Sequence, residues 1–352
     1  MGTVIQLSLP SRIAPMAERV SALIGLFATQ RRVEDDVFWL KENAELLNIL
    51  ECTGISVDPA SLAVHEGFYT RAEERLRFFP QYYRFILSLT LDIEALGMKG
   101  DAGERMAHFA ADQGLADAEL SDLQRAEARR LMMRRGIDPL NDPGLDDRLR
   151  AFAARDRTFA LPNKKAAYEL THIAYYLSEY GRRDPRLPQS AVRSLHFAGL
   201  TAFLEQNADL LAEICIALIH AGETPPEIWT DWLGAQTRGF ATESGPGVPL
   251  QDDYHEFFVC NWHAATVGAP VFRIPVAMER TRFDRAARPA PLREISLALM
   301  ELEGARCGEW PVMRRRMAPH LSPETVDLIE IAAASSVHFD AFFEGFARAG
   351  AA

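Results

Sequence analysis

The segment NKKAAYELTHIAYYLSEY (residues 163–180) has the spacing of an amphipathic α-helix. Ala166, Leu170, Ile173 and Leu177 follow one another at intervals of three or four residues and therefore form one apolar stripe. Asn163 precedes the first turn and is a favourable N-cap residue. The same periodicity predicts helices over residues 36–51, 70–97, 117–134, 190–221, 226–238, 251–266, 292–303 and 322–347. The chain is therefore predicted to be all-α.

Prolines and glycines mark the places where these helices break. Pro80 is expected to interrupt the stretch 70–97, and residues 190–221 are numerous enough for two helices. Residues 271–276 show a hint of strand alternation, but Pro275 restricts them to a sheet edge. About a dozen helices without a sequence repeat fit an irregular bundle or an α/α double ring better than a regular solenoid. We expect a single helical domain over residues 1–352, with 136–144 as the candidate subdomain boundary.

The composition excludes several classes of partner. Of the 352 residues, 48% are hydrophobic and 25% are charged, which is typical of a globular protein. The formal net charge of −11 argues against nucleic acid, which is bound through clustered Lys and Arg. No apolar run reaches the roughly 18–20 residues that span a bilayer, so no membrane partner is expected. Four widely spaced cysteines favour reduced thiols and a cytoplasmic location, while the oligomeric state stays open.

Two predicted helices carry a carboxylate three residues before a histidine. Glu169 and His172 lie in residues 163–180, and Asp252 and His255 lie in residues 251–266. Positions i and i+3 share one helix face, so each helix can present an acid and an imidazole together. Helix bundles hold non-haem metals with this arrangement on facing helices. These four residues are the predicted ligands of a metal, for which a divalent transition metal is the candidate.

Three further residues on the same segments are candidates for acid–base chemistry. Tyr176, Glu256 and His263 would either orient the metal ligands or transfer protons. Tyrosines and other aromatic residues surround both motifs, which favours a partly buried cavity that binds a small-molecule ligand. The simpler explanations are a solvent-exposed face for the first helix and an internal hydrogen-bond network for the second.

A bundle site with two metals would need two more carboxylates from other helices. Glu42, Glu205 or Asp209 can supply them, but no spacing singles one out. Asp209 and Glu213 lie one helical turn apart and are most simply explained as a solvated face. Separately, Asn43 and Asn207 interrupt apolar stripes, so both amides are predicted to be buried and hydrogen-bonded.

Three strings together carry a family resemblance: DVFWLKENA (36–44), RLRFFPQYY (75–83) and NKKAAYELTH (163–172). They resemble a bacterial family of all-helical proteins known only as a domain of unknown function. The resemblance spans most of the chain and implies no activity. The residues themselves predict a metal-dependent or acid–base enzyme with a buried His/carboxylate site between helices. The alternative is a non-catalytic binding or scaffold protein whose buried polar residues only fix helix packing.

Overall fold

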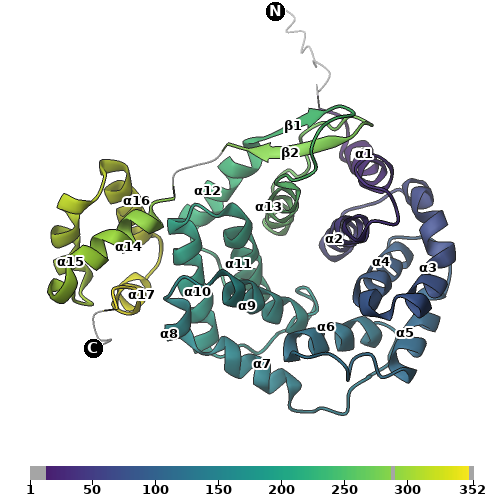
Figure 1. Cartoon of the computed structure of the whole chain (residues 1–352), viewed down its shortest axis with the longest axis horizontal. Coiled ribbons are helices and arrows are strands. Elements are labelled where there is room, and N and C mark those ends of the chain that lie inside the picture. Colours follow the sequence, from purple (N-terminus) through teal and green to yellow (C-terminus); the bar gives the residue numbers. More distant parts are fainter. Residues whose placement is uncertain (1–12, 287–289, 349–352) are drawn as a thin grey trace, which may run out of the picture.

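The computed structural model describes residues 13–286 and 290–348. Helices form nearly all of the regular structure in this part, which confirms the all-α prediction. They are arranged as two concentric rings (Figure 1), so the double ring is the arrangement that this chain adopts. The described residues form 17 α-helices, whereas about a dozen were predicted. Short helices such as α8 (Asp156–Phe159) span too few turns to show a periodicity in the sequence.

The inner ring is closed. Each of its helices packs against the next one, and α13 packs back against α2. Its members are α2 (Val37–Thr53), α4 (Tyr83–Ala95), α6 (Asp122–Met133), α9 (Lys164–Leu177), α11 (Ala208–His220) and α13 (Tyr254–Thr266).

Along the chain, helices of the outer ring alternate with helices of the inner ring. The short helix α8 lies between α7 and α9, and β1 (Phe240–Ser244) lies between α12 and α13. The members of the outer ring are α1 (Met16–Thr29), α3 (Glu66–Phe78), α5 (Ala102–Asp112), α7 (Leu145–Ala153), α10 (Gln189–Leu204) and α12 (Glu227–Arg238). The 3₁₀ turns η1 (Pro59–His65) and η2 (Pro80–Tyr82) lie in the connections on either side of α3.

Local sequence signals mark several of the helix ends. The Asp36 side chain accepts a hydrogen bond from the backbone of α2, and Gly54 ends this helix with a left-handed φ of 66°. Asn163 caps α9 as predicted. The predicted start of α6 near Asp117 is wrong, because Ser121 caps that helix instead.

Two predicted helices are each divided in the structure. Residues 190–221 form α10 and α11, and residues 322–347 form α16 (Pro323–Ser335) and α17 (Phe339–Phe346). The predicted edge strand at 271–276 is absent from the described residues. The antiparallel pair consists instead of β1 (Phe240–Ser244) and β2 (Thr281–Arg285), with Phe240 opposite Arg285. This two-stranded sheet, whose strands flank α13 in the chain, lies over the α1 and α13 side of the ring.

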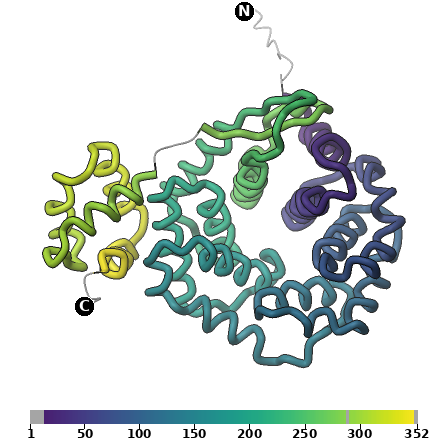
Figure 2. Tube along the Cα trace, viewed as in Figure 1, coloured from purple at the N-terminus to yellow at the C-terminus, as the bar shows by residue number. Residues whose placement is uncertain are grey.

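The C-terminal helices form a separate group on the outside of the double ring (Figure 2). They are α14 (Leu292–Glu301), η3 (Glu303–Ala305), α15 (Trp310–Met317), η4 (Ala318–His320), α16 and α17. Helices α16 and α17 pack against α10, and α16 also packs against α12. Among the described residues, no helix combines the length and the apolar character needed to cross a membrane.

A buried arginine joins the two ends of the inner ring. Arg31 follows α1, and its guanidinium donates to Glu42 of α2 at 2.9 Å and to Asp252, just before α13, at 2.8 Å. The rings of Phe27 and Tyr254 flank the same guanidinium at 4.8 and 5.3 Å. The closure of the ring therefore rests on a buried ion-pair cluster within an aromatic layer.

Candidate metal site between α11 and α13

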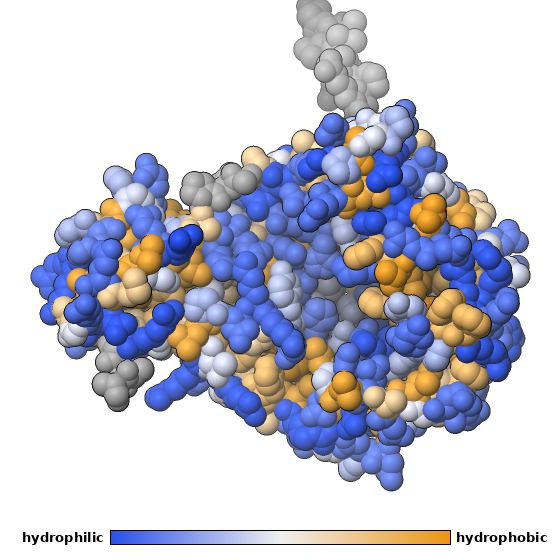
Figure 3. Space-filling view, in the orientation of Figure 1, coloured by the Kyte–Doolittle hydropathy of each residue, from blue (hydrophilic) through white to orange (hydrophobic). Residues whose placement is uncertain are grey.

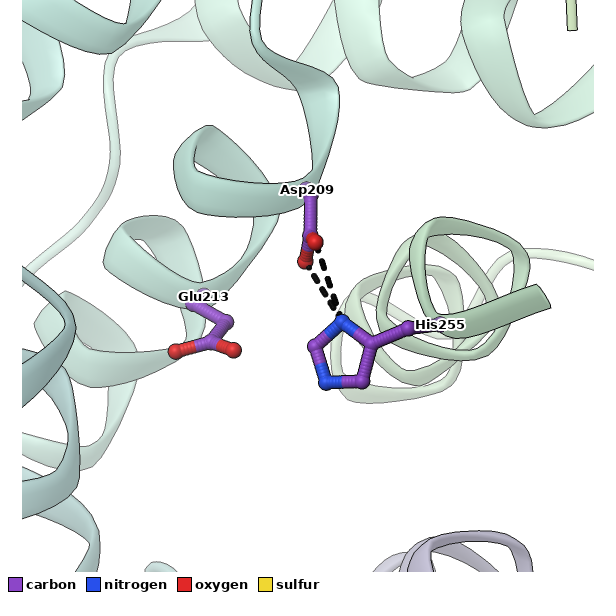
Figure 4. A group of neighbouring side chains, drawn as sticks. All are labelled: Asp209, Glu213 and His255. Carbon is purple, nitrogen blue, oxygen red and sulfur yellow. Dashed lines mark hydrogen bonds and ion pairs between the residues drawn. The ribbon is translucent and has the colours of Figure 1, made fainter. Parts of the chain in front are cut away.

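Helix α11 (ADLLAEICIALIH) is the most enclosed helix of the ring. It packs against α9, α10, α12 and α13, and almost all of its side chains are buried. Asp209 and Glu213 are the carboxylates of this helix. They lie one turn apart and therefore share a face, and both project toward α13 (Figure 4). Asp209 is in the first turn, where the helix dipole favours a negative charge.

His255 meets these carboxylates from the first turn of α13. Its Nδ1 lies 3.0 Å from each of the two oxygens of Asp209. One potential ligand atom from each of Asp209, Glu213 and His255 lies within 4.8 Å of the others. The side chain of Asp209 is 22% exposed and that of His255 is 32% exposed, whereas Glu213 is 3% exposed. The group is thus open to solvent on one side and buried on the other.

Helix α2 contributes the neighbouring charges on the open side. Oε1 of Glu45 lies 3.9 Å from Nε2 of His255 and 3.0 Å from the ammonium group of Lys41. The Tyr254 hydroxyl donates to Glu45 at 3.2 Å. In Figure 3 the face of the molecule is hollowed near the centre of the ring, and most of the surrounding residues are hydrophilic.

Helix α9 supports the group from the buried side. The Thr171 hydroxyl donates to Oε2 of Glu213 at 2.6 Å, and the Tyr175 hydroxyl donates to the Glu213 carbonyl at 2.8 Å. Nδ1 of His172 lies 2.7 Å from the carbonyl oxygen of Tyr168. A carbonyl only accepts, so Nδ1 carries a proton, and the neutral form of the ring therefore has its lone pair on Nε2. His172 also interacts electrostatically with Glu213, which places it beside the group.

The protonation of the group is displaced from its ordinary state. Burial lowers the pKa of His255, but the Asp209 carboxylate outweighs burial and raises this pKa to about 10. Burial raises the pKa of Glu213, while His172 and His255 act in the opposite direction. At neutral pH His255 is therefore an imidazolium, and burial makes the charged form of Glu213 less favourable than it is for an exposed glutamate.

This geometry is close to that of a metal-binding group. Ligand atoms that share one ion at roughly 2.0–2.2 Å lie at most about 4.4 Å apart, so the observed 4.8 Å needs only a small contraction. Two carboxylates and an imidazole suit a divalent transition metal such as Zn²⁺ or Mn²⁺. Without a metal, the Asp209–His255 pair has the composition of an acid–base couple.

The other predicted residues of the second motif have separate partners. Helix α13 begins at Tyr254, so Asp252 precedes the helix and does not share a helical face with His255. Its carboxylate accepts from Arg31 and from the backbone N–H of Phe283. Glu256 forms an ion pair with Arg285 of β2.

The remaining predicted residues are distributed around the neighbouring helices. Glu169 is half-buried on α9 and lies outside the group. Tyr176 is buried and lines a cavity between α6, α7 and α9. His263 is buried, and its burial lowers its pKa to about 4, so it is neutral. Of the predicted site residues, the structure brings His255 into the group and His172 to its edge.

Asp209 and Glu213 are the residues that sequence reasoning discounted. The explanation as a solvated face is wrong for Glu213, which is buried. The signal was present in the composition of the helix. A solvated face needs several polar positions along its length, whereas residues 208–218 hold two acids in an otherwise apolar run.

The two asparagine predictions have different outcomes. Asn43 is fully buried, donates to the carbonyls of Phe27 and Trp39, and bonds to His65 at 2.9 Å, as expected. Asn207 is hydrogen-bonded but only half-buried. It is the N-cap of α11 and not an interruption within a helix.

The chain was also compared with known proteins. Residues 1–349 match the family described as "Domain of unknown function (DUF6902)". The chain belongs to this family. No curated protein and no solved structure matches it. The family assignment agrees with the resemblance noted in the sequence and adds no activity, so a functional proposal rests on the site itself.

Proposed function

We propose that this protein is an enzyme that binds one divalent transition metal through Asp209, Glu213 and His255 and acts on a small molecule in the hollow of the ring. The observation that carries the proposal is the convergence of these three side chains from α11 and α13. A metal held there would supply a Lewis acid to the substrate or a bound water of lowered pKa. His172 then serves as a further ligand or as a proton acceptor through its free Nε2.

The electrostatics of the group support a cation. Without a metal, the positive charge that faces Asp209 and Glu213 is the proton on His255. The neighbouring carboxylates stabilise this proton and raise the pKa of His255 to about 10. A divalent ion replaces that proton and also removes the cost of burying the Glu213 charge. Metal binding should therefore release protons, and its affinity should rise about tenfold per pH unit between pH 7 and 9.

Metal analysis tests the proposal directly. The full-length protein is stripped with a chelator and titrated with Zn²⁺ and with Mn²⁺ in a calorimeter, and the bound metal is then measured by mass spectrometry. We expect about one ion per chain. Glu213→Gln and His255→Gln should each weaken binding by about 100-fold or more, because each removes a direct ligand.

Two matched variants serve as controls. Asp231→Asn removes an exposed carboxylate of α12, and His108→Gln removes an exposed imidazole of α5. Both should bind metal like the wild type. Binding of neither ion, or equal binding by Glu213→Gln and the wild type, would contradict the metal proposal.

The same residues support a second candidate, a metal-free acid–base enzyme. The specific observation is the pairing of His255 with both oxygens of Asp209, which leaves Nε2 toward the hollow. Here the imidazolium donates a proton and Glu45 accepts one. Activity that survives exhaustive chelation but is lost in Asp209→Asn would favour this candidate. A scaffold role predicts that neither metal binding nor any turnover depends on these residues.

A further inference from the structure

A second polar cavity lies where α6, α7 and the end of α9 meet. Its volume is about 110 Å³, and arginines and a tyrosine dominate its polar lining. These are Arg129 and Arg130 of α6, Arg183 after α9, and Tyr176. Ala126, Met133 and Leu177 provide an apolar wall. None of these residues belongs to the candidate metal site.

Arg130 is the decisive residue of this cavity. Its side chain is 4% exposed, and the Tyr180 ring covers its guanidinium at 4.3 Å. Glu179 lies 3.5 Å from Nε but makes no hydrogen bond with it. Within residues 13–286 and 290–348, Nε and Nη2 of Arg130 have no hydrogen-bond acceptor. A buried cation with two unused donors is costly unless an anion reaches it.

The other arginines are already partly engaged. Arg129 donates to Asp138 at 2.5 Å. Arg183 donates to the carbonyl of Leu177 at 2.8 Å and lies 3.5 Å from Glu179. The cavity lining therefore holds three guanidinium groups and the two carboxylates of Asp146 and Glu179. Arg129 has the carboxylates of Asp138 and Asp146 beside it, whereas Arg130 and Arg183 share the single carboxylate of Glu179. The positive charge that this carboxylate does not balance lies at Arg130 and Arg183.

We infer that this cavity binds the oxyanion group of a small molecule, a carboxylate or a phosphate, with Arg130 as its principal ligand. Guanidinium groups recognise both anions through paired N–H donors. The Tyr176 hydroxyl can add a further hydrogen bond, and the apolar wall accommodates a short carbon body attached to the anion. The inference does not depend on the proposed metal site, because it rests on a different set of residues.

Binding of two simple probes tests the inference. Inorganic phosphate and benzoate are titrated separately into the full-length, chelator-treated protein, and binding is followed by the melting temperature and by calorimetry. The chelator prevents phosphate from binding through a metal at Asp209. We expect at least one probe to bind saturably with about one site per chain. Benzoate binding alone assigns a carboxylate ligand, and phosphate binding alone assigns a phosphate ligand.

Substitutions then locate the binding site. Arg130→Gln should abolish binding, and Arg183→Gln should weaken it about tenfold by removing a second donor. Arg183 is 55% exposed, so its variant should fold even if Arg130→Gln does not. Arg157→Gln, at an exposed position of α8, is the matched control and should bind like the wild type, as should Glu213→Gln. Saturable binding of neither probe, or binding unchanged in both Arg130→Gln and Arg183→Gln, would overturn the inference.

Discussion

The start of α13 is flanked by two clusters of charge that differ in how completely they are paired. On one side, the side chains of Arg31, Glu42 and Asp252 are all 0% exposed. The guanidinium contacts both carboxylates, and Asp252 also accepts the backbone N–H of Phe283 at 2.8 Å. Arg32 supplies the second positive charge, because its Nε donates to Glu42 at 2.6 Å. The two arginines therefore balance the two carboxylates.

On the other side, the Asp209, Glu213 and His255 group carries more acid than base. His255 neutralises Asp209, but the partner of the Glu213 carboxylate within hydrogen-bond distance is the neutral Thr171 hydroxyl. The first cluster has no capacity for another ion, whereas the second does. The comparison indicates that the paired cluster stabilises the closed ring. The underneutralised group is the better candidate for a functional site.

The largest effect is expected from breaking the paired cluster. Arg31→Met leaves the buried Asp252 without its counter-charge, while Glu42 keeps Arg32 at 2.6 Å. The loss of the Asp252 pair should lower the free energy of unfolding by about 3–5 kcal/mol. Urea denaturation followed by circular dichroism measures this change. Arg71→Gln removes an exposed pair with Glu34 and should cost less than about 1 kcal/mol. If Arg31→Met and Arg71→Gln lower the free energy of unfolding equally, the buried ion pairs contribute no more to stability than the exposed one.

A neutral residue of the same region should have an intermediate effect. Asn43, one position after Glu42, bonds to two backbone carbonyls and to His65. Asn43→Leu leaves these groups unpaired and should cost about 1–3 kcal/mol in the same urea experiment. Asn207→Ala, which removes the cap of α11, should cost about 1 kcal/mol. An Asn43→Leu variant with unchanged stability would mean that water hydrogen-bonds to the carbonyls and to His65 in place of the amide.

The pH dependence of stability probes the second group. The folded-state pKa of His255 is about 10, above its ordinary value of 6.5. A raised pKa contributes stability that is complete below pH 6.5 and is lost as the pH rises toward 10. The melting temperature of the chelator-treated wild type should therefore fall across this window relative to His255→Gln. Parallel profiles would refute the raised pKa, and the shift can be measured independently by NMR titration of the imidazole.

The smallest effect on stability should come from Glu213. Burial raises its pKa, and glutamine keeps an acceptor for the Thr171 hydroxyl. Glu213→Gln should therefore change the free energy of unfolding by no more than about 1 kcal/mol, and in the stabilising direction if it changes at all. Metal binding should nevertheless be lost. If Glu213→Gln strongly lowers the free energy of unfolding, Glu213 has a structural role like that of the Arg31 cluster.

The fold was predictable because its signal is local. Apolar spacing of three and four residues indicated the helices, and Pro80 separated α3 from α4 as expected. Residues 190–221 were long enough for two helices, and they divide at Asn207, which caps α11. The division of residues 322–347 into α16 and α17 was not predicted.

The candidate site was predictable only in part. The histidines were singled out by their spacing from Glu169 and Asp252, but Glu213 is the carboxylate that lies near both of them. Helical spacing relates residues on one helix, whereas His172, Glu213 and His255 come from three different helices. The pattern of residues within a single helix therefore cannot predict that these three side chains lie close together.

The sequence by itself determined that the chain is helical, the approximate bounds of helices such as α2, α9 and α12, and which residue types are available for chemistry. These properties depend on contacts between residues three or four positions apart. The tertiary structure alone decided which charges are paired. Arg31 and Asp252 are separated by 221 residues, and His255 and Asp209 by 46. Such pairs exist only because the helices close into a ring, which brings α13 against both α2 and α11.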